Sequence, residues 1–347
     1  MSGPRLTASP WDRELIAQVH PPDWVNPRPA TRYHLVVVGA GTAGLVTAAG
    51  AAGLGARVAL VERYLMGGDC LNFGCVPSKA VLASARAAAD VRGAAELGVH
   101  ARGPVDVDFP AVMERMRELR AAVAPHDGAR RFRELGIDVF LGEARFRSRD
   151  EVEVGGARLR FARAVVATGG RPAIPPIEGL AEAGFHTHET IFDLTALPRR
   201  LAVVGGGPIG CELAQAFSRL GAEVTLVHSH SRLLPRDDPD ATAILLAAFR
   251  TGGVDVRLDT EVVRVERAGG DKVLHLSGES GRVAVDEILV AAGRLPNVES
   301  LGLDRAGVEC GPAGVEIDDH LRTTNRRVFA VGDVALPFRF THVADAA

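Results

Sequence analysis

The sequence HLVVVGAGTAG, residues 34–44, decides the fold that this chain is expected to adopt. A β-branched apolar run leads into Gly39, Gly41 and Gly44, and an alanine-rich segment suited to a helix follows them. In this spacing the glycines allow a tight turn, the close approach of a pyrophosphate and close packing of helix on strand. Glu62 ends the next apolar run, 23 residues after Gly39, where a carboxylate can bind an adenosine ribose. The pattern predicts a dinucleotide-binding unit, with a turn that serves packing alone as the less favoured alternative.

The same fingerprint recurs at residues 201–210, LAVVGGGPIG. There Gly205, Gly207 and Gly210 repeat the spacing 166 residues after the first set, and two copies are far more specific than one. Short alternating runs follow each copy, at about residues 137–170 and beyond position 250. The sequence therefore predicts an α/β protein with two Rossmann-like dinucleotide-binding domains, each carrying an added antiparallel β-meander.

The second copy differs from the first in the residue after its second strand. Counting 23 residues from Gly205 reaches His228 instead of an acid, and the loop HSHSRLLPR offers hydroxyls, Arg232 and Arg236. A carboxylate at this position would repel the 2′-phosphate of NADPH. The second site is therefore expected to bind NADPH in preference to NADH.

The stretch GGDCLNFGCVPSK, residues 67–79, sets Cys70 and Cys75 five positions apart. In a regular α-helix residues i and i+5 lie roughly 8 Å apart at Cα, beyond the ~4.4–6.8 Å of a disulfide, so the segment must bend at its glycines. Pro77 suits the first turn of a helix, which places Cys75 at a helix N-terminus, where the thiolate is favoured. We expect a redox-active dithiol or disulfide here, in preference to two buried structural cysteines.

The composition excludes several other classes of protein. With 347 residues, 47% of them hydrophobic, the chain can form two or three well-packed domains. A net charge of −3 gives no reason to expect nucleic acid or an anionic membrane as partner, and four cysteines do not make a secreted disulfide scaffold. The charge-free run 35–56 contains glycines that divide it into strand, turn and helix. We therefore expect no membrane span. We also expect a cytoplasmic location, and no metal at the histidines near residues 186–188 and 228–230.

Other segments give coarser expectations. Residues 1–31 are proline-rich and show no sustained period, so they form an arm that either docks or is disordered. Helices are expected at about 77–98 and 109–136, and strands at 137–146, 151–156 and 157–170. Lys79 and Lys272 are the only lysines among 40 basic residues, so a lysine inside the cysteine segment suggests a specific role.

Over residues 33–347 the chain resembles the pyridine nucleotide–disulfide oxidoreductases, in the branch that contains dihydrolipoamide dehydrogenase, glutathione reductase and mercuric reductase. The resemblance rests on both fingerprints, the cysteine segment, and three shorter motifs: ATG at 167–169, AAGRLPN at 291–297 and the late VFAVGD. It implies an FAD-binding domain in two parts, an NAD(P)H-binding domain, and the absence here of a C-terminal interface domain. The expected borders are 1–31 for the arm, 32–170 and 298–347 for the FAD-binding parts, and 171–297 for the nucleotide domain.

The resemblance also implies roles for individual residues. Cys75 would lie against the flavin as the charge-transfer thiol, Cys70 would be the interchange thiol that meets the substrate, and Lys79 would pair with Glu212 near the reactive flavin edge. The residues expected to bind FAD are Gly39, Gly41, Gly44, Glu62, Lys79, Thr168, Gly169, Arg294, Gly332 and Asp333. Those expected to bind NADPH are Gly205, Gly207, Gly210 and Arg232.

The function implied is electron transfer from NADPH through FAD to a Cys70–Cys75 disulfide, and from there to a small-molecule disulfide or a metal ion. Alternatives are a truncated or catalytically incomplete flavoprotein, or a diaphorase-type quinone or oxygen reductase. Full-length relatives are expected to be homodimers. The remaining thiols, Cys211 and Cys310, are expected to be packing or surface residues.

Overall fold

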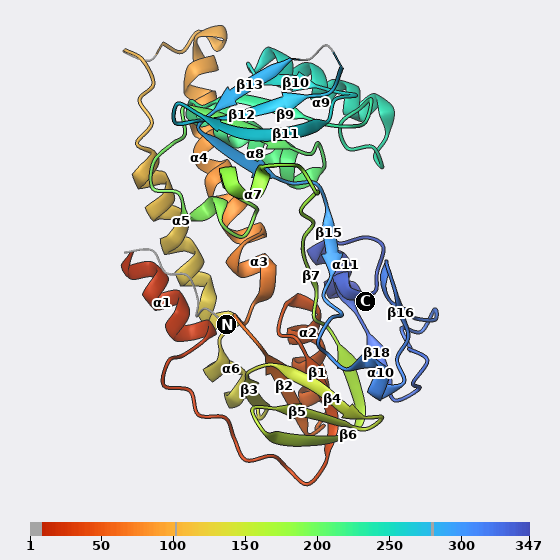
Figure 1. Cartoon of the computed structure of the whole chain (residues 1–347). Helices are drawn as coiled ribbons and strands as arrows, with labels where there is room; N and C mark the ends of the chain where they lie inside the picture. The colour runs from red at the N-terminus through yellow and green to blue at the C-terminus, as the bar shows by residue number, and fades with distance from the viewer. Residues whose placement is uncertain (1–8, 101–102, 279–280) are drawn as a thin grey trace. The chain divides into compact units, whose positions relative to one another are not determined.

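The computed structural model describes residues 9–100, 103–278 and 281–347 (Figure 1). The chain forms two compact units, each assembled from separate segments. The first comprises Met1–Asn72, Arg117–Arg171 and Arg294–Ala347, and the second comprises Phe73–Met116 and Pro172–Gly293. Each contains a parallel sheet with helices, so the expected α/β class with two Rossmann-like units is confirmed.

The first unit is built on a parallel sheet with the strand order β3-β2-β1-β6, and β18 pairs with β6. All five positions of β2 are buried, as is typical of a parallel strand that is covered on both faces. The first part of β6 pairs antiparallel with β5, and the strand then continues into the parallel sheet, so the meander and the sheet share one strand. The strands are β1 (Tyr33–Val38), β2 (Val58–Glu62), β3 (Asp138–Leu141), β4 (Ala144–Ser148), β5 (Glu151–Val154), β6 (Ala157–Val166), β7 (Gly170–Pro172), β15 (Arg294–Pro296), β16 (Cys310–Gly311), β17 (Gly314–Val315) and β18 (Val328–Ala330).

One helix of this unit, α2 (Thr42–Gly53), connects the parallel strands β1 and β2 and begins at the first glycine turn. Other helices of this unit are α1 (Pro10–Val19), α3 (Gly68–Asn72), α6 (Ala129–Glu134), α10 (Leu303–Ala306) and α11 (Thr341–Ala346), with 3₁₀ turns η2 (Ala124–His126) and η5 (Gly332–Val334). Helix α5 (Phe109–Val123) begins in the second unit and ends in the first.

The second unit repeats the plan with the parallel order β10-β9-β8-β14 and a separate antiparallel sheet β11-β12-β13. Helix α4 packs along α8, and both contribute to one apolar core with the parallel strands (Figure 1). The elements are α4 (Cys75–Gly93), η1 (Ala94–Leu97), α7 (Leu180–Ala183), η3 (Ile191–Asp193), β8 (Arg200–Val204), α8 (Pro208–Leu220), β9 (Glu223–Val227), α9 (Pro239–Thr251), β10 (Asp255–Arg257), β11 (Val262–Ala268), β12 (Asp271–Leu276), β13 (Arg282–Val285) and β14 (Glu287–Val290).

Several expected elements differ from those observed. The helix expected at 109–136 is three pieces, because Pro125 cannot donate to the helical ladder and Gly128 is extended at the start of α6. The strand expected at 137–146 is two strands, β3 and β4, separated by Gly142 at φ 149°. The helix expected at 77–98 begins earlier, at Cys75, and ends at Gly93 before a 3₁₀ turn.

The N-terminal arm, expected to lack a regular period, contains the ten-residue helix α1 with four buried side chains. The charge-free run 35–56 is indeed a strand, a turn and a helix. Among the described residues, no helix combines the length and apolarity that crossing a membrane requires.

Candidate functional site

The first glycine turn brings β1, α2 and the end of β6 into close contact. A Cβ atom on Gly39, whose φ is 106°, would lie 2.3 Å from the Ala167 carbonyl oxygen. A Cβ on Gly44 would lie 1.9 Å from the Gly39 carbonyl oxygen. Gly41, the residue before α2, has only the Cα of Gly68 near it, at 3.7 Å. The outer two glycines are therefore required by packing, whereas a Cβ on the half-buried Gly41 would make only ordinary contact.

The carboxylate of Glu62 reaches this turn from the end of β2. Its Oε2 accepts a hydrogen bond from the Ala40 amide at 2.7 Å, and its Oε1 accepts one from the Tyr64 amide at 2.7 Å. Burial raises the pKa of Glu62, and the two amides oppose that shift. Each carboxylate oxygen has a further lone pair that can accept a ribose hydroxyl.

The second turn reproduces the first in its close contacts. A Cβ on Gly205, at φ 118°, would lie 2.3 Å from the Ala291 carbonyl oxygen, and one on Gly210 would lie 1.9 Å from the Gly205 carbonyl oxygen. A Cβ on Gly207 would meet nothing within 4 Å. The two copies therefore share the backbone geometry as well as the sequence pattern.

His228 takes the position in the second turn that Glu62 has in the first. Its Nδ1 accepts a hydrogen bond from the Gly206 amide at 3.1 Å, so the neutral ring carries its proton on Nε2. The ring lies so close that a Cβ on Gly206 would be 2.8 Å from it. The Nε2 atom is buried. Burial, followed by the neighbouring His230, lowers the pKa of His228.

Both turns fit the phosphates of a dinucleotide. Helices α2 and α8 start after Gly41 and Gly207, and neither start is capped by a side chain. The amides in the first turn of α2, and those that follow Pro208 in α8, therefore remain available as donors to an anion. The residues present thus fit an FAD diphosphate at the first turn and a nicotinamide dinucleotide at the second.

The cysteine segment folds as two helices divided by a bend. Cys70 lies in α3, Cys75 is the first residue of α4, and both are partly buried. A Cβ on Gly68, at φ 57°, would lie 2.6 Å from the Gly41 Cα, so the start of α3 packs directly on the first nucleotide turn. Asn72 fixes the start of α3, since its Nδ2 donates to the carbonyls of Met66 at 3.0 Å and Gly68 at 2.8 Å.

Lys79 and Glu212 form an ion pair between α4 and α8. The Lys79 Nζ lies 2.7 Å from both Glu212 oxygens. Their side chains are 59% and 39% exposed, so the pair contributes little to stability.

The residues expected near the flavin from the two C-terminal motifs lie together in the first unit. Arg294 Nε lies 3.2 Å from Asp333 Oδ2, and its Nη2 donates to Asp69 and to the Gly170 carbonyl at 3.0 Å. Burial raises the pKa of Asp333, while Arg294 lowers it. A Cβ on Gly332 would contact the Ala43 Cβ at 3.3 Å, in the first turn of α2.

The remaining expected residues have more local partners. Thr168 Oγ1 donates to the Asn297 carbonyl at 2.7 Å, and the Gly169 carbonyl accepts from the Asn297 amide at 2.9 Å. Arg232 Nη2 donates to the Pro235 carbonyl at 2.7 Å within its own loop. Cys211 is buried, which raises the pKa of its thiol to about 12, and Cys310 is exposed.

The sequence motifs did not identify Asp69, Asn72 or Asn297 as site residues. Asp69 and Asn72 stand inside the cysteine segment and Asn297 inside AAGRLPN, so their motifs were visible in the sequence. Their partners Arg294 and Thr168 lie 225 and 129 positions away, and only the folded chain identifies them.

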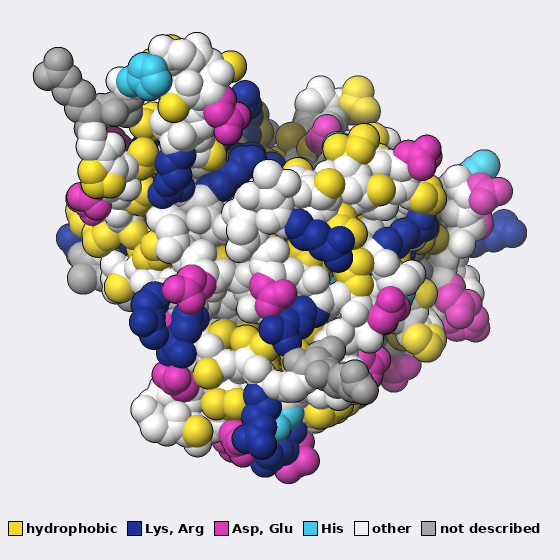
Figure 2. Space-filling model, turned by 90° about the horizontal axis from the view of Figure 1, so that it is seen from above, with side chains coloured by type: hydrophobic (Ala, Val, Ile, Leu, Met, Phe, Trp, Pro, Cys, Tyr) yellow, Lys and Arg dark blue, Asp and Glu magenta, His cyan; other side chains and the backbone are white. Residues whose placement is uncertain are grey.

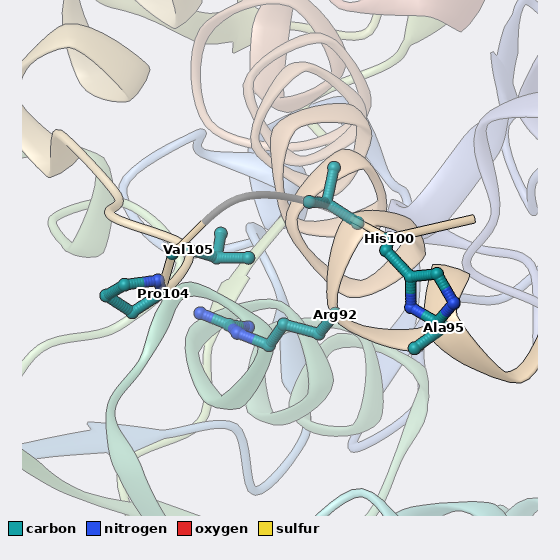
Figure 3. Close-up of a pocket in the computed structure, with 7 residues that line it drawn as sticks. Arg92, Ala95, His100, Pro104 and Val105 are labelled. Atoms are coloured by element: carbon teal, nitrogen blue, oxygen red, sulfur yellow. The ribbon is translucent and has the colours of Figure 1, made fainter. Parts of the chain in front are cut away.

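A hollow in the second unit lies apart from these residues. It is bounded by the end of α4 and the segment that follows, with Arg92 lying toward Pro104 and Val105, and His100 beside Ala95 (Figure 3). It shares no residue with either glycine turn or with the cysteine pair. On the molecular face shown in Figure 2, basic and acidic side chains are interspersed.

Comparison with known proteins gives one family. Its model, described as pyridine nucleotide-disulphide oxidoreductase, matches residues 33–347. A mercuric reductase of Bacillus cereus is 34% identical over 315 residues, which make up 90% of this chain and 50% of that protein. A dihydrolipoyl dehydrogenase of Chlamydia trachomatis is 35% identical over 319 residues, or 90% of this chain and 68% of that protein.

Solved structures give the same result. A copper(II) complex of the HOCl-induced flavoprotein disulfide reductase RclA from Escherichia coli matches with a TM-score of 0.79 and 29% identity, over 91% of this chain and 69% of that one. The chain thus spans about half to two thirds of the length of these relatives.

Proposed function

The chain belongs to the pyridine nucleotide–disulphide oxidoreductase family, and on that premise we propose that it carries electrons from NADPH through FAD to Cys70 and Cys75 and then to an acceptor. One observation carries the proposal: two nucleotide turns with matching glycine contacts occur in one chain, and the helix that bears Cys70 packs on the first of them. A structural cysteine pair would have no reason to lie against a phosphate-binding turn.

Most of the residues proposed to hold FAD lie in the first unit. The Gly39, Gly41 and Gly44 turn and the amides at the start of α2 would bind its diphosphate, and Glu62 would accept ribose hydroxyls. Asp333 would accept a hydrogen bond from a hydroxyl group on the flavin side of FAD. We also assign to this site Lys79, Thr168, Gly169, Arg294 and Gly332. The chemistry that FAD supplies when bound is two-electron transfer between the nicotinamide and the cysteine pair.

The cysteines would divide the next step between them. A disulfide between Cys70 and Cys75 that gains two electrons and two protons becomes two thiols. Cys75, at the first position of α4, is favoured as thiolate by the amides there and would remain beside the flavin. Cys70 would be the thiolate that attacks the acceptor. Lys79 would keep a positive charge near the reactive flavin edge, oriented by Glu212.

NADPH is the nucleotide that the second turn favours. His228 replaces the acid of the first turn, and a neutral Nε2–H donor does not repel a 2′-phosphate as a carboxylate would. Gly205, Gly207, Gly210 and Arg232 complete the proposed site. The acceptor is proposed to be a small-molecule disulfide or a metal ion, a choice supported by the names of the mercuric reductase and disulfide reductase relatives. The few cysteines favour a reducing compartment such as the cytoplasm.

The decisive experiment is spectroscopic. The purified chain should be yellow, and anaerobic reduction should produce a long-wavelength absorption band from a thiolate beside the flavin. Cys75→Ser should abolish that band, whereas Cys310→Ser should retain it. A colourless protein, or a band that survives Cys75→Ser, would show that the proposal is wrong.

A second candidate is a diaphorase that passes electrons from the flavin to a quinone or oxygen. Transfer of electrons from the nicotinamide to the flavin needs only the two nucleotide sites, so this activity would not require the Cys70 thiol. The two functions can be distinguished by whether activity requires the Cys70 thiol.

A further inference from the structure

Residues 9–32, which precede the region matched by the family model, pack on the rest of the first unit through specific contacts. Ser9 caps α1 by accepting from the Trp11 amide at 3.3 Å. Further along, Asn26 binds the edge of β3, donating to the Leu141 carbonyl at 3.0 Å and accepting from the Leu141 amide at 2.8 Å. The family model begins at residue 33 and does not extend over this segment.

Helix α1 carries a charge on its buried face. Asp12 is 3% exposed and lies against two buried arginines of α5, with Oδ1 2.6 Å from Arg120 Nη2 and Oδ2 3.9 Å from Arg117 Nε (Figure 1 shows α1 beside α5). Removing ions from water costs several kcal/mol each, and good geometry is needed to recover that cost. The cluster therefore specifies how α1 docks, where apolar packing alone would permit sliding.

The same arginine reaches the cysteine segment. Arg120 Nη1 donates to the Asn72 carbonyl at 2.9 Å, at the end of α3 and two residues after Cys70. At the other end of that segment, the Met66 amide donates to the Val19 carbonyl, the last residue of α1, at 3.1 Å. Residues on both sides of Cys70 are thus tied to α1, one directly and one through Arg120.

We propose that α1 is a clamp on the redox helix, with Asp12 and Arg120 as positioning residues for the Cys70 thiol. Asp12 orients Arg120, and Arg120 fixes the last carbonyl of α3, two residues after Cys70, where its positive charge would favour the Cys70 thiolate. The inference rests on the interchange role proposed for Cys70. The contacts that carry it involve neither nucleotide nor flavin.

Alkylation of the reduced full-length chain by iodoacetamide tests the clamp without any turnover. Fragment spectra of the tryptic peptide 64–79 assign the label to Cys70, and the pH dependence of the rate separates thiolate formation from access. Arg120→Met should move the midpoint of that profile to higher pH and slow labelling at neutral pH by roughly three- to tenfold. Arg120→Lys, which keeps the charge, should retain the midpoint.

Arg130→Met is the matched control. Arg130 holds the same segment, through the Ala17 carbonyl at 3.0 Å and Asp23 at 3.1 Å, without contacting α3. Its loss should leave the Cys70 profile unchanged. A profile for Arg120→Met identical to that of wild type overturns the proposal. If that variant does not fold, hydrogen exchange of residues 70–72 in Arg120→Lys decides: faster exchange supports the clamp, and wild-type exchange refutes it.

These outcomes are independent of the proposed function. A colourless protein would refute the flavoprotein proposal, yet the alkylation profile could still be measured. An unchanged profile in a yellow, active protein would refute the clamp alone.

Discussion

His228 and Glu62 accept a hydrogen bond from equivalent amides, those of Gly206 and Ala40, yet a carboxylate can carry a negative charge and an imidazole cannot. His228→Glu should keep the amide contact, because Glu62 makes the same contact in the first turn. It should weaken NADP⁺ binding by tenfold or more through repulsion of the 2′-phosphate, and strengthen NAD⁺ binding. Isothermal titration with both nucleotides measures the change.

His228→Gln is the control for charge, since it offers an amide oxygen to Gly206 and no negative charge. It should retain the preference for NADP⁺. Equal losses of both nucleotides in the glutamate variant would mean that residue 228 only supports the turn.

The pH dependence of stability should also report on His228. Burial, reinforced by His230, lowers its pKa, whereas the Arg232 backbone and Asp259 act in the other direction. Above the ordinary pKa of 6.5 the ring is neutral in both the folded and the unfolded chain, so its titration does not change the free energy of unfolding there. Below that pH the unfolded chain takes up the proton first, and stability falls until the folded ring is also protonated. Wild type should therefore lose more melting temperature than His228→Gln between about pH 7 and 5 by differential scanning fluorimetry. Parallel curves would contradict this.

The glycine turns are matched elements, which allows each site to be removed alone. Gly44→Ala would place a Cβ 1.9 Å from the Gly39 carbonyl oxygen, and Gly210→Ala would do the same at Gly205. Each should push its helix away from its own turn. We expect Gly44→Ala to be purified with little flavin while it retains NADP⁺ binding, and Gly210→Ala to keep its yellow colour while NADP⁺ affinity falls at least tenfold. Flavin content and isothermal titration measure the two effects. Loss of flavin from both variants would show that the turns are not independent.

These turns could be predicted from sequence because their chemistry is local. The two outer glycines of each turn are needed where one backbone crosses another, and their spacing reveals that need without any tertiary information. Helix α1 could not be predicted in the same way. Ser9 and Pro10 are start signals, but Asp12 lies on the buried face and interrupts the apolar stripe formed by Leu15, Ile16 and Val19. Its partner Arg120 is 108 positions away, and the pattern makes sense only once the two meet.

At the scale of the whole chain, the two proposed functions are distinguished by whether reduction of the acceptor requires the cysteine thiols. The two proposed functions share NADPH and flavin and differ only in the last step. Cys70→Ala removes the thiol proposed to attack the acceptor, while both nucleotide turns keep their contacts. It should therefore retain most NADPH-dependent quinone reduction and lose at least a hundredfold of any disulfide reduction, since the remaining thiolate, Cys75, is assigned to the flavin and not to the acceptor.

The comparison is made by assaying one preparation with a quinone, with lipoamide and other disulfides, and with mercuric ion. Cys310→Ala, which removes an exposed thiol outside the proposed site, should match wild type with every acceptor. Disulfide reduction that survives Cys70→Ala would contradict the assigned order of the two cysteines. If wild type reduces quinone but no disulfide or metal ion, the 347-residue chain acts as a diaphorase. The cysteine pair would then not pass its electrons to a disulfide or to a metal ion.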